Sequence, residues 1–136
     1  GTVQVDALMN VERYSHVMHI VSNVIGKLRA DKDQFDVLRA CFPAGTVSGA
    51  PKIRAMEIID ELEPTRRAVY TGAIGMLPLD GRMTLSIAIR TMLLHGTHVT
   101  FQAGGAITAD SDPAAEYEET LIKAKALARS IESSLL

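Results

Sequence analysis

Two glutamates, Glu116 and Glu119, stand three residues apart near the C-terminal end of the chain, and Lys123 follows four residues later. If this segment is helical, all three side chains lie on one face. Two carboxylates on one face can bind Mg²⁺, a hard cation that takes oxygen ligands and keeps several of its waters. A solvated helix face with one glutamate–lysine pair fits the same spacing, so the pattern alone leaves both interpretations open.

A glycine-containing loop at 43–52 leads directly into a helical pattern at 53–62. Pro51 suits the first turn of that helix, where its missing N–H costs little. The hydroxyls of Thr46 and Ser48, together with the unpaired amides of the helix start, then suit an anionic group. The spacing differs from that of a phosphate-binding Walker A loop, and a purely structural turn is an equal alternative.

Three further side chains are candidates by type. Arg90 stands on the polar face of an alternating pattern, where a guanidinium can grip a carboxylate through two hydrogen bonds or remain an exposed strand charge. His19 lies among valines, which on pattern alone is typical of a core histidine. Tyr70, at the start of an extended segment, fits a half-buried aromatic residue.

The bulk composition excludes several classes of function. The 136 residues suffice for one modest domain, and 14 basic against 16 acidic residues give a net charge of −2, which disfavours a strongly cationic nucleic-acid surface. No apolar run approaches the roughly 20 residues of a membrane span, and no signal-peptide pattern opens the chain. A lone Cys41 excludes an internal disulfide and a cysteine metal cluster. We therefore expect a cytoplasmic protein with neither nucleic acid nor membrane as partner.

Helices are predicted at three places. The patterns at 33–41 and 53–62 are helical, and Glu63-Pro64 ends the second because proline cannot continue it. A final helix begins after Asp112, a suitable N-cap. Its apolar stripe consists of Tyr117, Leu121, Ala124, Ala128 and Ile131.

Strands are predicted between these helices and before them. The segment 11–28 fits either periodicity, with its β-branched residues favouring a strand. The segment 69–79 is extended, Asp80-Gly81 indicates a two-residue hairpin turn, and 82–94 alternates as one strand. His95-Gly96 then turns the chain into a further strand at 97–103. Antiparallel strands with flanking helices indicate the α+β class.

These segments in order resemble the chorismate-binding enzymes, a family that includes anthranilate-forming, aminodeoxychorismate-forming, isochorismate-forming and salicylate-forming members. The resemblance covers nearly the whole chain and rests on residues 14–22, 43–59, 72–75, 87–91, 109–113 and 116–120. The amino-acid sequence of the loop, together with Arg54-Ala55-Met56, is similar to that of the two chorismate-aminating branches. The implied fold is the C-terminal portion of a two-sheet β-sandwich, so residues 1–136 are interpreted as one partial domain.

The resemblance also implies roles for individual residues. His19 matches the histidine over the substrate ring, assigned to acid–base or positioning work. Thr46 matches a threonine that holds substrate through its hydroxyl and the loop amides. Tyr70 and Arg90 match residues on the enolpyruvyl side of chorismate, with Arg90 gripping a carboxylate.

The remaining matches lie further along the chain. Gly104 and Gly105 match a glycine turn whose backbone approaches a substrate carboxylate. Glu116 and Glu119 match the acidic helix that holds Mg²⁺, and Lys123 matches a substrate-side lysine on the same face. Each role suits chorismate, which has two carboxylates and a ring hydroxyl to expel.

Two positions depart from the family pattern. Ala68 follows Arg66-Arg67 where the family usually has glycine, and Ala106 ends a turn that often ends in glycine. A methyl group at 106 would crowd the substrate if that residue required a positive φ.

The implied reaction converts chorismate and ammonia to anthranilate and pyruvate with Mg²⁺, the ammonia coming from a glutamine amidotransferase subunit or domain. The alternative is the aminodeoxychorismate branch, whose members the sequence at 71–75, 80–83 and 104–105 resembles more.

Family members are considerably longer, and their N-terminal part carries a further metal-binding glutamate and the strands that complete the sandwich. We therefore expect this piece alone to be inactive. A truncated, non-catalytic binding piece, or a homo-oligomer formed through unpaired hairpin edges, is a further alternative.

Overall fold

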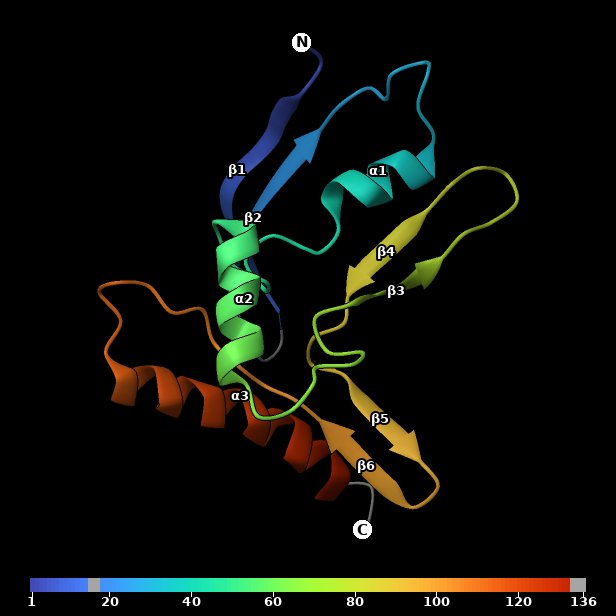
Figure 1. Cartoon of the computed structure of the whole chain (residues 1–136). Helices are drawn as coiled ribbons and strands as arrows, with labels where there is room; N and C mark the ends of the chain where they lie inside the picture. Colours follow the sequence, from blue (N-terminus) through green and yellow to red (C-terminus); the bar gives the residue numbers. More distant parts are fainter. Residues whose placement is uncertain (15–17, 133–136) are drawn as a thin grey trace. The chain divides into compact units, whose positions relative to one another are not determined.

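The computed structural model describes residues 1–14 and 18–132 and has an α+β architecture (Figure 1). Each strand pairs with a neighbour along the chain in an antiparallel hairpin, so the predicted class is confirmed. In chain order the elements are β1 (Gln4–Arg13), β2 (Met18–Ile25), α1 (Gln34–Cys41), α2 (Lys52–Leu62), β3 (Ala73–Met76), β4 (Thr84–Ile87), β5 (Met92–His95), β6 (His98–Phe101) and α3 (Pro113–Glu132).

The chain divides into two compact units, Gly1–Val37 and Leu38–Leu136, and each is described here by itself. The interpretation of residues 1–136 as one partial domain stays a prediction.

The first unit contains the β1–β2 hairpin. Its register runs from Gln4 opposite Ile25 to Arg13 opposite Met18, with an irregularity between Val5 and Asn10. The range 11–28, favoured as a strand, contains β2 at Met18–Ile25 and also the last residues of β1, at 11–13; the rest of β1 was not predicted. Apolar residues alternate with polar ones along most of β1, at Val5, Ala7, Met9 and Val11, so a strand signal was present there; two register shifts interrupt the pairing with β2.

The three helices lie where the sequence placed them, because their ends are set by local chemistry. Asp33 Oδ1 accepts hydrogen bonds from the amides of Phe35 (2.9 Å) and Asp36 (3.0 Å) and so caps α1. Asp112 Oδ1 likewise accepts from the amide of Ala115 at 2.8 Å and caps α3. Pro51 is the extended N-cap of α2, so it lies just before the first turn in which the sequence placed it, and Glu63 is the C-cap.

The second unit contains the hairpins β3–β4 and β5–β6. The β5–β6 turn is tight, with His95 opposite His98 and Gly96 at φ +61°, as expected. The β3–β4 hairpin is also confirmed, but Met76 pairs with Thr84, so the connection runs over 77–83 and is longer than the two-residue turn predicted at Asp80-Gly81.

The single strand predicted at 82–94 is wrong. Residues 88–91 interrupt it and separate β4 from β5, which belong to different hairpins. At the break, the Ala88 amide donates to Gly72 O (3.0 Å) and Ala88 O accepts from the amide of Thr71 (2.9 Å). These bonds attach Ala88 to a distant turn, and Arg90 adopts φ +53°, which ends the alternation.

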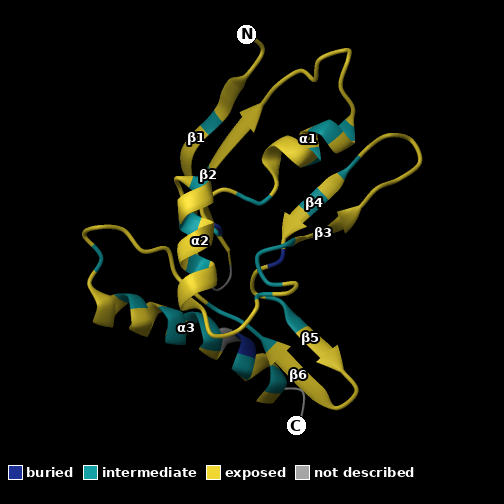
Figure 2. Ribbon diagram, viewed as in Figure 1, coloured by how far each residue is buried: buried dark blue, intermediate teal, exposed yellow. Residues whose placement is uncertain are grey.

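Few side chains of the described residues are buried (Figure 2). The buried apolar residues are Ala88 and Leu127, and Ser48 is the buried polar one. Large apolar side chains such as Val3, Ile53 and Leu79 are exposed. No helix in the described ranges is both long enough and apolar enough to cross a membrane.

Candidate functional site

A cleft of about 550 Å³ lies within the second unit. Its walls come from the loop after α1, the turn after α2, the break between β4 and β5, the segment after β6, and α3. The predicted site residues that line it are Thr46, Tyr70, Arg90, Gly104, Gly105 and Lys123. Its volume falls within the range of roughly 300–1,000 Å³ that is usual for small-molecule sites.

The loop that carries Thr46 folds back on the first turn of α2. Gly49 has φ +81°, and a Cβ at this position would lie 2.4 Å from the Cβ of Ala55. Only glycine fits such a close approach in the left-handed region. Thr46 is placed on the cleft, whereas Ser48 is not: its hydroxyl donates to Ala44 O at 2.7 Å, and the residue as a whole is only 7% exposed. The expectation that both hydroxyls face one anionic group is therefore wrong for Ser48.

Tyr70 is carried by a turn with strained backbone. Ala68 and Thr71 have φ +51° and +65°, in the region that residues with a Cβ rarely adopt. The Tyr70 amide donates to Arg67 O (2.9 Å), and the bonds of Ala88 hold the turn from the other side. The positive φ of Ala68 gives a physical reason for the family's preference for glycine there. Ala106 does not have a positive φ, so its backbone does not produce the crowding of the substrate by a methyl group that was considered for this position.

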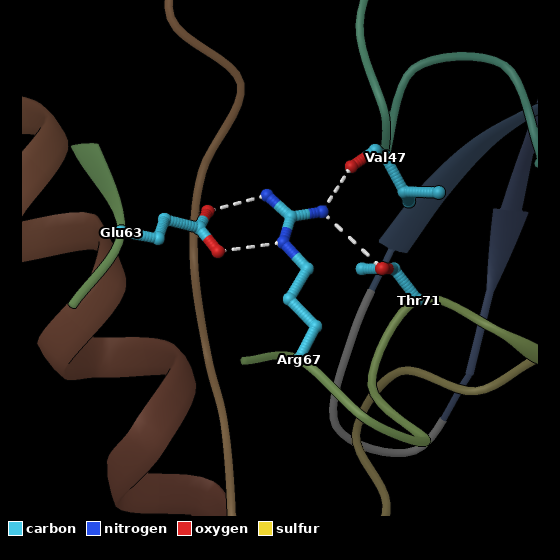
Figure 3. A network of polar contacts seen from close by, with 4 residues as sticks. All are labelled: Val47, Glu63, Arg67 and Thr71. Atoms are coloured by element: carbon cyan, nitrogen blue, oxygen red, sulfur yellow. Dashed lines mark hydrogen bonds and ion pairs between the residues drawn. The ribbon is translucent and has the colours of Figure 1, made fainter. Parts of the chain in front are cut away.

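Arg67 lines the same cleft and was not singled out from the sequence. Figure 3 shows its polar contacts. Its guanidinium makes two hydrogen bonds to the carboxylate of Glu63, at 2.8 and 2.5 Å. These bonds hold the pKa of Glu63 below its ordinary value and raise that of Arg67. The available signal was the Glu–Arg spacing of four residues across the end of α2.

Arg90 is exposed at the break between β4 and β5. It makes no hydrogen bond or ion pair with any residue in the described ranges. The charge of Arg90 nevertheless acts on Glu119 of α3. The pKa of Glu119 is lowered mainly by its contact with Lys123 and, more weakly, by Arg90. Arg90 therefore presents an unused guanidinium to the cleft, although on a turn rather than on the predicted strand.

The glycine turn lies between Tyr70 and α3. A Cβ at Gly104 would lie 3.1 Å from the Tyr70 hydroxyl, and one at Gly105 would lie 3.1 Å from Glu116 Oε2. Lys123 Nζ donates to Gly104 O at 3.2 Å. The turn thus brings polar groups from three segments together around two residues that have no side chain.

The two glutamates of α3 have different surroundings. Glu116 is half-buried, and its Oε1 accepts from the Ser111 hydroxyl at 2.6 Å. Glu119 forms an ion pair with Lys123. Within the described part of the chain no three acidic, histidine or cysteine side chains come close enough together to hold a metal. Two carboxylates supplemented by water and substrate oxygens still fit Mg²⁺, which is commonly bound in this way.

His19 belongs to the first unit. It is exposed on β2, opposite Glu12 in the register, with its ring centroid 6.0 Å from that of Tyr14. The cleft residues belong to the second unit. The part of the resemblance at 15–17 lies outside the described residues.

The sequence pattern of the chorismate binding enzymes matches residues 1–129. This is almost the whole chain, so the chain belongs to the chorismate binding enzyme family. The resemblance stated from its motifs is thereby confirmed.

Individual relatives share a large fraction of identical residues with this chain. Anthranilate synthase component 1 of Synechocystis sp. is 60% identical in an alignment 136 residues long that covers 96% of this chain and 27% of that protein. The protein of the same name from Aquifex aeolicus is 56% identical over 132 residues, covering 97% of this chain and 27% of its own length. The chain therefore spans about 27% of the length of the curated relatives it matches.

A solved structure is similar in fold as well as in sequence. The crystal structure of anthranilate synthase component I from Streptococcus pneumoniae superimposes with a TM-score of 0.86 and 52% identity. The match covers 93% of this chain and 29% of that chain.

Proposed function

We propose that this chain is the C-terminal catalytic part of an enzyme that converts chorismate and ammonia to anthranilate and pyruvate. The observation that carries the proposal is the gathering of Thr46, Tyr70, Arg90, Lys123 and the glycine turn around one cleft. The names of the relatives support the choice of the anthranilate branch. They favour it over aminodeoxychorismate formation, the alternative from the sequence.

The groups around the cleft suit a dianionic substrate. Arg90 has an unused guanidinium that can grip one carboxylate through two hydrogen bonds. The backbone at Gly104 and Gly105 permits close approach by a second carboxylate, beside the positive charge of Lys123. The hydroxyls of Thr46 and Tyr70 would orient the ring and the enolpyruvyl group.

The reaction balances without a redox partner. Ammonia forms a C–N bond at C2 of chorismate as the C4 hydroxyl leaves as water, and elimination of pyruvate then gives the aromatic ring of anthranilate. Acid–base or positioning work by His19 stays a prediction that rests on the resemblance alone. Mg²⁺, held by Glu116 and Glu119, would neutralise charge on substrate oxygens.

The proposal extends to the rest of the protein. A glutamine amidotransferase subunit or domain would supply the ammonia, and further strands outside these residues would complete a two-sheet sandwich. The cytoplasmic location and a homo-oligomeric state stay predictions.

The test uses the full-length protein with chorismate, ammonium and Mg²⁺. Formation of fluorescent anthranilate and of pyruvate supports the proposal. A non-aromatic amino product without pyruvate would identify the aminodeoxychorismate branch instead, and no consumption of chorismate would overturn both.

The metal assignment has its own prediction. Glu119→Gln removes one anionic ligand, so we expect the Mg²⁺ concentration for half-maximal turnover to rise on the order of tenfold or more. Glu118→Gln is the matched control, because Glu118 is exposed on the same helix but outside the Glu116/Glu119/Lys123 face. Equal Mg²⁺ dependence in the two variants would contradict the assignment.

A further inference from the structure

The two peptide carbonyls that flank Thr46 are each held by a cation. Lys52 Nζ donates to Gly45 O at 2.6 Å, and Arg67 Nη1 donates to Val47 O at 2.6 Å. The donors come from the start of α2 and from the turn beyond its end. Thr46 lines the cleft, and its side chain forms no hydrogen bond with a described residue, but its backbone is fixed from both sides.

Lys52 directs its donors into the loop itself. Besides Gly45 O, its ammonium donates to Ala44 O (3.3 Å) and to Ser48 Oγ (2.5 Å). A lysine has three N–H donors, and each has an acceptor here. Lys52 is accordingly not available to bind an anion, although a lysine that follows a glycine loop is easily interpreted as an anion ligand.

Arg67 connects the loop to the turn that carries Tyr70 (Figure 3). While two of its bonds reach Glu63, Nη1 donates both to Val47 O and to Thr71 Oγ1, the latter at 3.2 Å. Its guanidinium carbon also lies 5.6 Å from the centre of the Tyr70 ring, within the range of a cation–π contact. Four of its five N–H donors are thus engaged, so Arg67 is committed to protein groups although it lines the cleft.

We propose that Lys52 and Arg67 are positioning residues that set the place of Thr46 and, through Arg67, of Tyr70. They act on the ligand through the two hydroxyl residues and make no contact with it themselves. The effect on chorismate rests on the proposed function; the effect on the loop does not. Charge-assisted hydrogen bonds suit this task because they are roughly twice as strong as neutral ones.

The loop is tested first, by hydrogen exchange in the ligand-free full-length protein. We expect amides in 45–49 to exchange at least about tenfold faster in Lys52→Met and Arg67→Gln than in the unmodified protein. Arg66→Gln is the matched control: Arg66 belongs to the same turn, is exposed and does not line the cleft. Unchanged exchange in 45–49 in both variants would overturn the proposal whatever the substrate is.

The second test separates positioning from general stability by steady-state kinetics. We expect Arg67→Gln to raise KM for chorismate on the order of tenfold, with a smaller change in kcat and none in KM for ammonia. In a background with both Thr46→Val and Tyr70→Phe the same substitution should have little further effect on KM, because its influence runs through these two residues. Independent, additive effects would overturn the proposal.

Arg67→Lys and Lys52→Arg keep the charge and serve as variants if a neutral substitution prevents folding. Lysine cannot reproduce the fork that joins Glu63, Val47 and Thr71, so Arg67→Lys should restore the fold but not the low KM. If the unmodified enzyme does not consume chorismate, the proposed function fails, and the exchange experiment still decides the role of the two cations.

Discussion

At the scale of single residues, the polar groups of the cleft fall into two sets. Arg67 and Lys123 are engaged by protein acceptors. The side chains of Thr46, Tyr70 and Arg90 form no hydrogen bond with any residue the structure describes. Groups of the first kind shape a site, and groups of the second kind can exchange water for a ligand at little cost.

The unused guanidinium leads to a prediction about Arg90. In the full-length enzyme, Arg90→Gln should lower kcat/KM for chorismate on the order of a hundredfold, since a charged pair with a substrate carboxylate is lost. Arg82→Gln is the control, because Arg82 pairs with Asp80 in the exposed loop between β3 and β4. Near-normal kcat/KM in Arg90→Gln would contradict its assignment.

The carboxylate of Glu63 gives a prediction about pH. Its pKa is lowered in the folded protein by the hydrogen bonds from Arg67, so the pair stabilises the fold above the ordinary value of 4.5 and loses that effect as the pH falls through the lower folded value. At pH 7 the free energy of unfolding should therefore be larger for the unmodified protein than for Glu63→Gln. This difference should shrink toward pH 3.

Chemical denaturation across that pH range measures the effect. Glu61→Gln is the control, because Glu61 contacts Arg54 at 3.4 Å and both side chains are largely exposed, so it should contribute less. A difference for Glu63→Gln that stays constant with pH would contradict the role given to the Glu63–Arg67 pair.

At the scale of elements, short hydrogen-bonded junctions hold the cleft residues in place. Ala88 joins the break between β4 and β5 to the Tyr70 turn, and Gly49 lets the Thr46 loop close against α2. Both junctions use small residues, because a larger side chain would separate segments that must touch.

Gly49→Ala tests the second junction. The left-handed φ and the 2.4 Å approach to Ala55 both oppose a methyl group, so we expect a loss of about 2 kcal/mol or more in the free energy of unfolding. Gly45→Ala is the matched control in the same loop, since its Cβ would meet no atom within 4 Å. Thermal or denaturant unfolding of both variants checks this, and equal losses would contradict it.

At the scale of the whole molecule, the described residues leave much apolar surface exposed. Val3, Leu8 and Ile20 in the first unit, and Ile53 and Leu79 in the second, are more than half exposed. Relatives devote about 27% of their length to the matching segment. So little burial cannot offset the entropy of ordering the chain.

We therefore predict that the 136-residue chain expressed alone forms no anthranilate, binds a hydrophobic dye and self-associates. The full-length protein should show activity and weaker dye binding. Dye fluorescence, size-exclusion mass and product assay measure the three properties. A monomeric, cooperatively unfolding and active 136-residue chain would contradict the prediction.

The sequence by itself determined the helices, their caps, the tight β5–β6 turn and membership of the family. These features depend on neighbouring residues: Asp33 and Asp112 cap helices through amides two or three positions away. The family motifs likewise named six residues that the structure brings to one cleft.

Only the tertiary structure decided the interruption at 88–91, the internal use of Ser48 and the part played by Lys52 and Arg67. Each depends on partners distant in sequence, as when Arg67 reaches Val47 and Ala88 pairs with Thr71 and Gly72. Local periodicity contains no information about such partners. The positive φ of Arg90 is likewise unfavourable by itself, and it lies two residues after Ala88, whose bonds to the distant turn fix the break.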